Sequence, residues 1–368
     1  MNLHRLNVIL LALGLLALLA GMWAGLVRIG WDWPALIPEF FAAHGPLMVG
    51  GFLGTLIGLE RAVALGRPWA YIGPAAAGLS VPALLVGAPW PVVPILLLLG
   101  SIGIGVDFFA LVVIYPSWSG WTMGLGALCW VVGNVVWLAE RSVPAAVFWW
   151  IGFLVLTIAG ERLELNRSSG LTGWSRLLFG LAAGVLLVGL LFCLPGGNLV
   201  LGMRVSGVGL SAMAVWLLVY DMARSTVRQR GLTRFVAASL LLGFVWLGTS
   251  GILAFAYAGQ LFGFGYDAIL HSLFLGFAVT MIFAHAPVIF PGITGQAVPF
   301  RPSFYSYLIL LHLALILRIG SDVAQWHTGQ MWGGLGNATA LLLFVVSIVM
   351  AVRAGRAGGR SSEVATPG

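Results

Sequence analysis

Twelve apolar segments, each long enough to cross a lipid bilayer as a helix, follow one another through the chain with only short loops between them. Loops and prolines place them at about residues 8–27, 38–59, 69–87, 91–114, 119–139, 143–163, 174–194, 199–220, 234–257, 266–290, 303–320 and 331–352. With 60% hydrophobic and 8% charged residues, no soluble packing could hide this much apolar surface. The sequence therefore predicts an all-α, polytopic membrane bundle of about 12 transmembrane helices.

The loops contain no polar stretch long enough for a soluble domain, so residues 1–352 are expected to form one transmembrane domain. Residues 353–368, which are basic and then small and polar, are expected to be a disordered tail. Twelve spans put both termini on one side, and all arginines except Arg28, Arg141, Arg204 and Arg318 fall on that side. By the positive-inside rule the termini and the tail are cytoplasmic, as in a multi-pass protein of a bacterial inner (plasma) membrane.

A short motif recurs in the second, sixth and tenth segments. Gly276-Phe-Ala-Val-Thr280 resembles Gly51-Phe-Leu-Gly-Thr55 and, more loosely, residues 152–157 (GFLVLT). The residue nine positions after each glycine is polar: Glu60, Glu161 and His285. The repeat unit is thus four helices long, which predicts three pseudo-repeated four-helix arcs with a site between them.

Two function classes lack support in the sequence. The net charge of +7 comes from arginines spread over short loops, so we expect no nucleic acid among the partners. We expect membrane lipid to surround the protein. Cys129 and Cys193 lie in apolar segments and form neither a C-x-x-C nor a C-x-x-C-H motif, which leaves thiol redox chemistry, iron–sulfur clusters and covalent c-type haem without support.

Four histidines lie inside apolar segments, where ionisable groups tend to mark function, and two of them, His44 and His271, form the first candidate pair. His44 and His271 each follow the expected start of their helix, Pro38 or Gly265, by six residues. At 1.5 Å per residue, both lie about 9 Å inside the outer membrane boundary. Imidazoles at equal depth on helices from different arcs could hold one haem iron from its two faces. Alternatively, each ring only hydrogen-bonds a neighbour or a backbone carbonyl.

The segments around these histidines resemble known haem proteins. Residues 43–54 (AHGPLMVGGFLG) are similar to the haem-ligand segment on the second helix of haem–copper oxidase catalytic subunits. Residues 271–282 (HSLFLGFAVTMI) are similar to the histidine-bearing late helix of the NnrS family of haem- and copper-associated membrane proteins. The resemblance implies that His44 and His271 are the axial ligands of a low-spin haem b, in a setting of nitrogen-oxide metabolism.

The sequence also departs from the oxidases. The sixth segment contains no histidine, the seventh contains no adjacent His pair, and the tenth lacks two closely spaced histidines. An oxygen-reducing haem–copper centre is therefore not expected. His285 is the first residue of the segment 285–292 (HAPVIFPG). This segment resembles the copper-ligand segment of the oxidases but lies on a different helix.

Other polar residues are secondary candidates. His285 could bind a second haem or a copper ion with His312, or it caps the helix end near Pro287.

Arg318, and after it Arg204, could pair with haem propionates, or they extend to the outer headgroups. Met48, one turn after His44, could approach the same metal but more often such a residue is packing. His4 and His327 are expected to be solvated.

Acidic residues in the segments have structural and functional interpretations. Glu60-Arg61 and Glu161-Arg162 recur at the expected cytoplasmic ends of the second and sixth segments, where ion pairs would lock the arcs together or admit protons. Asp107, which has no cation near it in sequence, is a candidate proton relay or a group that hydrogen-bonds within the bundle.

Three hypotheses follow. The first is a b-type cytochrome with one haem, and a second possible, on the periplasmic side; whether it is an enzyme stays open, and a six-coordinate iron favours electron transfer. Its partners would be subunits of a respiratory complex or a soluble cytochrome. The second is a transporter or channel without haem, for which internal repeats are equally good evidence. The third is a structural subunit whose haem is vestigial or missing.

Overall fold

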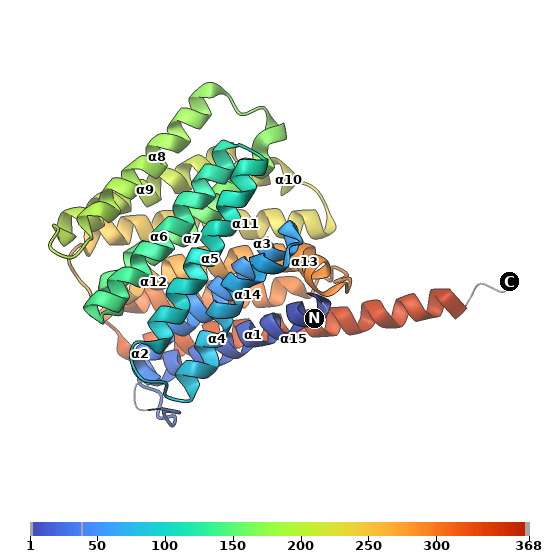
Figure 1. Cartoon of the computed structure of the whole chain (residues 1–368), viewed down its shortest axis with the longest axis horizontal. Helices are drawn as coiled ribbons and strands as arrows, with labels where there is room; N and C mark the ends of the chain where they lie inside the picture. Colours follow the sequence, from blue (N-terminus) through green and yellow to red (C-terminus); the bar gives the residue numbers. More distant parts are fainter. Residues whose placement is uncertain (1–2, 38–39, 365–368) are drawn as a thin grey trace.

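The computed structural model describes residues 3–37 and 40–364, and these form helices and turns without any strand (Figure 1). In chain order the elements are α1 (Leu3–Arg28), α2 (Phe40–Gly45), the π-helix η1 (Pro46–Gly54), α3 (Thr55–Leu65), the 3-10 turn η2 (Pro68–Tyr71), α4 (Ile72–Leu85), α5 (Val92–Ile114), α6 (Trp118–Glu140), α7 (Val143–Leu165), the 3-10 turn η3 (Asn166–Ser169), α8 (Gly173–Phe192), α9 (Leu199–Tyr220), α10 (Ala223–Thr226), α11 (Gly231–Ala256), α12 (Gly263–His271), the π-helix η4 (Ser272–Val279), α13 (Thr280–Thr294), α14 (Phe304–Val323) and α15 (His327–Val364). Pro38, the expected start of the second helix, lies outside the described residues.

The chain is a multi-pass membrane protein. Among the described residues, eleven helices are long and apolar enough to span a bilayer, counting α2–η1–α3 and α12–η4–α13 as one each. The expected third span is the exception, because α4 has only 14 residues. It is preceded by η2, and the two together carry the chain from one end of the bundle to the other. The all-α, polytopic bundle that the sequence predicts is confirmed.

Helix ends carry the expected signals. The side chains of Ser117, Thr172 and Asn198 each accept a hydrogen bond from a backbone N–H in the first turn of α6, α8 and α9. Such caps satisfy amides that have no partner within the helix. At the other end, α3 and α13 stop at Gly66 and Gly295, which adopt the left-handed conformation that favours glycine. Local sequence thus sets the boundaries of these spans.

The helices pack in three groups of four with the same internal pairing. In each group the first helix packs on the second and the third packs on the fourth. The pairs are α1 with α2–η1–α3, α4 with α5, α6 with α7, α8 with α9, α11 with α12–η4–α13, and α14 with α15. This pairing is compatible with the three four-helix arcs expected from the sequence repeat, but α5 also packs on α6 and α9 on α11, across the boundaries between the groups. The second helices of the groups also approach one another, since α3 contacts α13 and α7 contacts η4.

The two ends of the bundle differ in what gathers there. At the terminal end, where α1 begins, the Asn7 side-chain amide donates to the carbonyl of Ile293 at 2.9 Å. At the opposite, distal end, the α4–α5 loop meets the α6–α7 loop, with Arg141 over the ring of Trp90 at 5.4 Å. Figure 1 shows α2 and α12 near the distal end and both chain termini at the other. Long-range contacts of this kind align the ends of helices that are far apart in sequence.

The C-terminal segment differs from expectation. Residues 353–368 were expected to be disordered, but α15 continues as helix to Val364, beyond the last span, and residues 365–368 lie outside the described part. Residues 353–364 contain three glycines, which are poor helix formers, but the first proline after residue 353 is Pro367, so no proline interrupts the helix. The helix that crosses the membrane can therefore propagate out of it.

Candidate functional site

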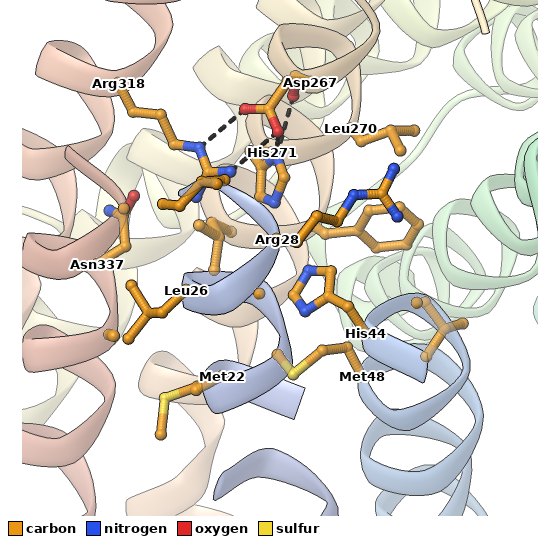
Figure 2. Close-up of a pocket in the computed structure, with 18 of the residues that line it drawn as sticks. Met22, Leu26, Arg28, His44, Met48, Asp267, Leu270, His271, Arg318 and Asn337 are labelled. Carbon is orange, nitrogen blue, oxygen red and sulfur yellow. Dashed lines mark hydrogen bonds and ion pairs between the residues drawn. The ribbon is translucent and has the colours of Figure 1, made fainter. Parts of the chain in front are cut away.

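A cavity of about 350 Å³ opens at the distal end between the first and third groups of helices, with α7 as a further wall (Figure 2). Its walls are mostly apolar, with side chains such as Met22, Leu26, Phe52, Phe274 and Leu341. Polar groups enter it from several helices: His44, His271, Arg28, Asp267, Arg318 and His327. An apolar cavity with a few converging polar groups is the usual form of a cofactor or ligand site.

His44 and His271, which the sequence singles out as a pair, meet in this cavity. Their ring centres lie 6.1 Å apart, and the ring planes are within 26° of parallel. His44 comes from α2 and His271 is the last residue of α12, so the first and third groups of helices contribute one ring each. The structure thus brings together two imidazoles from segments far apart in the chain.

Both histidines stand directly before a π-helical segment. His44 precedes η1 by one residue, Gly45, and His271 is followed at once by η4. The recurring glycine motif lies within these segments, which end where α3 and α13 begin, at Thr55 and Thr280. The equivalent stretch of α7 stays α-helical. Because π-helical turns are rare and concentrate at functional sites, their presence beside both histidines marks this end of the bundle.

The His44 ring is held by the backbone of α1. Its Nδ1 lies 2.7 Å from the carbonyl oxygen of Gly21. A carbonyl only accepts, so Nδ1 donates and Nε2 of the neutral ring carries a free lone pair. Gly25 makes room for the ring, because a Cβ there would lie 2.8 Å from both Cε1 and Nδ1 of His44. Met48 lies beside the same helix, with its sulfur 2.7 Å from where a Cβ of Gly21 would be.

The His271 ring is held by its own helix and by a carboxylate. Its Nδ1 lies 3.0 Å from the carbonyl oxygen of Asp267 and 3.2 Å from Oδ1 of the same residue. Arg318 of α14 donates from Nε and Nη2 to the two carboxylate oxygens of Asp267, each at 2.9 Å (Figure 2). His271 therefore also uses Nδ1 as a donor and has Nε2 available.

The three arginines considered for this end of the protein have different positions. Arg318 lines the cavity and is 6% exposed, but it is engaged by Asp267. Arg204 is not among the residues lining the cavity, and its guanidinium lies over the ring of Phe255 at 5.7 Å. Arg28, at the end of α1, lines the cavity and is exposed, and no ion pair of it is found in the described part of the chain. Arg28 is thus the cation that the site leaves available.

His285 and His312, the candidate pair for a second metal site, each have a hydrogen-bond partner of their own. His285 Nδ1 lies 2.8 Å from the carbonyl oxygen of Met281. His312 Nδ1 accepts a hydrogen bond from Trp246 Nε1 at 2.9 Å, so Nε2 of the neutral ring holds the proton and cannot bind a metal. Within the described residues, no group of three or more His, Cys, Asp or Glu side chains could hold a metal ion.

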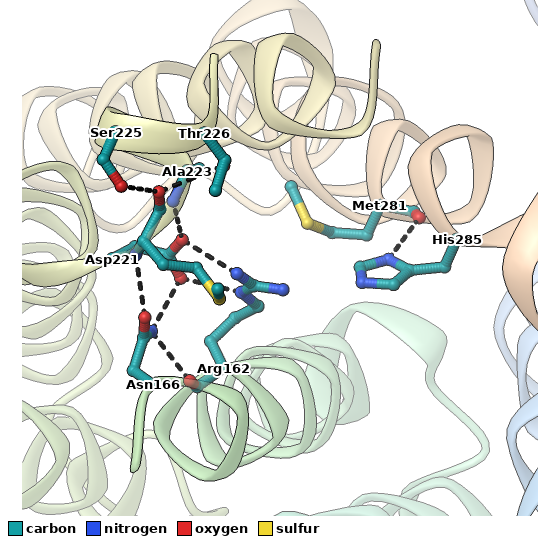
Figure 3. A network of polar contacts seen from close by, with 9 residues as sticks. Arg162, Asn166, Asp221, Ala223, Ser225, Thr226, Met281 and His285 are labelled. Atoms are coloured by element: carbon teal, nitrogen blue, oxygen red, sulfur yellow. Dashed lines mark hydrogen bonds and ion pairs between the residues drawn. The ribbon is translucent and has the colours of Figure 1, made fainter. Parts of the chain in front are cut away.

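The terminal end holds a separate polar network (Figure 3). Arg162 of α7 forms a two-point ion pair with Asp221, and Asn166 donates to the same carboxylate at 3.0 Å. Arg61 contacts both Glu60, at 3.1 Å, and Glu161 of α7, at 3.4 Å. The expected recurring Glu-Arg ion pairs therefore differ, because Arg162 turns to Asp221 and Arg61 links the first group of helices to the second.

Asp107 lies in α5, away from this cavity. It is 1% exposed, and neither carboxylate oxygen has a hydrogen-bond partner in the described part of the chain. The sequence-based candidate for a proton relay is thus buried but not connected to the histidines.

Sequence reasoning missed three residues of the site. Asp267 precedes His271 by four positions, which places both on one face of a helix, and this spacing was a usable signal. Arg28 was visible only as an arginine on the outer side. His327 is exposed, as expected of a solvated residue, and it also lines the cavity, with Nδ1 3.3 Å from Gln330 Oε1.

Comparison with known proteins gives a family but no relative with a described activity. A search of curated proteins found no match to the chain. Residues 5–353, nearly the whole chain, match a family described as a domain of unknown function (DUF8744). The protein therefore belongs to the DUF8744 family.

Proposed function

We propose that the protein is a membrane b-type cytochrome that binds one haem between His44 and His271. The single observation that carries this proposal is the 6.1 Å separation of the two ring centres across the distal cavity. A metal bound to both Nε2 atoms at about 2 Å, the usual metal–imidazole distance, would place the ring centres about 6 Å apart when the two Nε2 atoms face each other, since each centre lies about 1 Å behind its nitrogen.

The hydrogen bonds of the two rings support the same assignment. Metal-binding histidines usually donate their other N–H to a carbonyl or a carboxylate, which fixes the tautomer and the ring orientation. His44 uses the carbonyl of Gly21 and His271 uses Asp267, so both rings have Nε2 free for a metal. Histidines with a purely structural role need no such matched arrangement on two helices.

The rest of the cavity suits the porphyrin of a haem b. Apolar walls would enclose the macrocycle, and a propionate needs a cation at the cavity edge. Arg28, exposed and without an ion pair in the described residues, is the first candidate for this contact. Arg318 is the second, because Asp267 already occupies two of its donors. Arg204 has no place in this assignment.

Two axial histidines leave the iron no open position, so the bound haem would supply one-electron transfer and not ligand activation. The protein itself supplies the ligands, their orientation and an apolar surround. With the arginine-rich terminal end in the cytoplasm, the site lies near the periplasmic face of a bacterial inner membrane. Likeness to NnrS-type proteins favours a role in nitrogen-oxide respiration, with a soluble cytochrome or a respiratory complex as partner.

The test is the visible spectrum of the protein purified from haem-replete cells, together with iron and copper analysis. We expect a Soret band and a sharp α band on reduction, both lost in His44→Ala and in His271→Ala. His312→Ala, which removes a histidine outside the cavity, is the matched control and is expected to keep the spectrum. Colourless wild-type protein without bound metal would reject the cytochrome and favour a transporter.

A further inference from the structure

The two histidines of the cavity are oriented by groups of different charge. Nδ1 of His44 faces a neutral backbone carbonyl, that of Gly21, at 2.7 Å. Nδ1 of His271 faces the carbonyl of Asp267 at 3.0 Å and also its carboxylate, with Oδ1 at 3.2 Å. Only one of the two rings is therefore polarised by an ionised neighbour.

The carboxylate is held in this position by Arg318, which contacts both of its oxygens. Nε and Nη2 of Arg318 contact Oδ2 and Oδ1 of Asp267, each at 2.9 Å, which is the planar two-point geometry that fixes both partners. A flexible or solvated carboxylate could not orient a ring, whereas one fixed at both oxygens can.

The position of Arg318 depends in turn on close packing of α14 against α15. A Cβ at Gly333 would lie 2.7 Å from the Cα and Cβ of Arg318, and one at Gly334 would lie 3.3 Å from its Nη1. Small residues at these two positions let α15 cover the arginine, which is 6% exposed. A chain of contacts thus runs from α15 through Arg318 and Asp267 to the ring of His271.

We propose that Asp267, fixed by Arg318, is a positioning residue that orients His271 and sets the redox potential of the metal that this ring binds. The inference rests on the proposed haem site and adds that the two ligands have different roles. His44 is oriented by backbone alone. His271 is the ligand through which the protein sets the redox potential of the metal.

The direction of the effect follows from charge. A carboxylate on the Nδ1–H increases electron density on the ring, which stabilises the more highly charged, oxidised iron. Removing the negative charge of Asp267 should therefore raise the midpoint potential. Removing the positive charge of Arg318 should lower it. A substitution that only loosened the packing of the helices would not shift the potential according to the sign of the charge that it removes.

The experiment compares midpoint potentials of the purified haem-loaded protein by spectroelectrochemistry. Asp267→Asn keeps the size of the side chain and an oxygen for Arg318, and it removes the charge. We expect this variant to retain the haem spectrum and to shift the ratio of oxidised to reduced protein about tenfold, which is about +59 mV for one electron. Arg318→Gln should shift the ratio the other way.

Asp107→Asn is the matched control, because it neutralises a buried aspartate that does not line the cavity, and it should leave the potential unchanged. If Asp267→Asn alone does not assemble, the double variant Asp267→Asn with Arg318→Gln tests the role of Asp267 instead. Its midpoint potential should lie above that of the single variant Arg318→Gln.

The outcomes separate this inference from the proposed function. A wild-type haem spectrum that depends on His44 and His271, combined with an Asp267→Asn potential equal to wild type, would overturn the role of Asp267 and leave the cytochrome standing. Wild-type protein without haem would overturn both.

Discussion

The guanidinium of Arg162 in α7 and the carboxylate of Asp221 after α9 form a buried two-point ion pair, with Nε–Oδ2 at 2.7 Å and Nη2–Oδ1 at 2.8 Å. The same carboxylate accepts from the backbone N–H of Ala223 and from Asn166, so it ties the ends of two helices to the connecting turn. This network lies at the terminal end, far from the distal cavity. Its role is to stabilise the second group of helices.

Arg162→Leu should therefore destabilise the protein without changing the proposed haem site. The substitution leaves the Asp221 carboxylate buried and without its cation, which typically costs about 3–5 kcal/mol. Thermal unfolding in detergent, followed by tryptophan fluorescence, measures the loss. Arg167→Leu is the control, because Arg167 is 78% exposed and 3.9 Å from Glu164, and its removal should change stability by less than about 0.5 kcal/mol. Equal stability of both variants would contradict the role given to Arg162.

Gly25→Ala tests the contact between α1 and the ring of His44. The added Cβ would lie 2.8 Å from two ring atoms, so the imidazole must move away from the carbonyl of Gly21. Loss of a contact that orients a metal ligand commonly weakens metal binding by a factor of about 10 to 100. We expect the affinity of the purified protein for haem to fall by at least the lower factor, and haem to be lost more readily during purification.

Gly124→Ala is the control for this substitution, because it makes the same change in α6 where nothing lies within 4 Å of the added atom. It should leave haem content unchanged. If Gly25→Ala also binds haem fully, the ring of His44 does not depend on α1 as described.

Arg28→Ala tests the assignment of a propionate contact. Loss of a charge-assisted hydrogen bond costs about 1.5–3 kcal/mol, which corresponds to roughly a tenfold or greater loss of haem affinity. The rate of haem transfer to an excess of a haem-scavenging protein measures the effect. Arg204→Ala, which removes an arginine outside the cavity, should behave as wild type. The opposite ranking of the two variants would place the propionates elsewhere.

The orientation in the membrane is tested by chemical labelling. Leu36→Cys lies in the exposed loop after α1 at the distal end, and Gln229→Cys lies in the exposed turn before α11 at the terminal end. If arginines mark the cytoplasmic side, an impermeant maleimide added to intact cells should label position 36 and not position 229. The native Cys129 and Cys193 are buried and should give little background. The reverse pattern would put the cavity on the cytoplasmic side.

Much of the fold could be predicted from the pattern of apolar segments and from the loops and prolines between them. The predicted segment 199–220 agrees with α9 (Leu199–Tyr220), and 143–163 is close to α7 (Val143–Leu165). The agreement arises because a bilayer fixes the length of a span and polar loops must lie outside it. Prediction was weaker for α4, which has only 14 residues, and for the extension of α15, where nothing apolar sets the helix end.

The candidate site was only partly visible in the sequence. His44 and His271 stand out because ionisable side chains are costly in hydrocarbon. The π-helices η1 and η4 give no such signal, because the π-helical state depends on packing around the recurring motif; its third copy, in α7, is α-helical. Arg28 likewise acquires its place only when α1 packs beside α2. Contacts of this kind depend on tertiary structure and not on local pattern.

The central claim is that His44 and His271 hold one iron from opposite sides. Electron paramagnetic resonance of the oxidised, purified protein tests it most directly, because two imidazole ligands give a low-spin ferric signal. The account predicts this signal in wild type, at one iron per chain, and its replacement by a high-spin signal or by none in His44→Ala and His271→Ala. A wild-type protein that lacks the signal, or a low-spin signal that survives either substitution, would contradict the account.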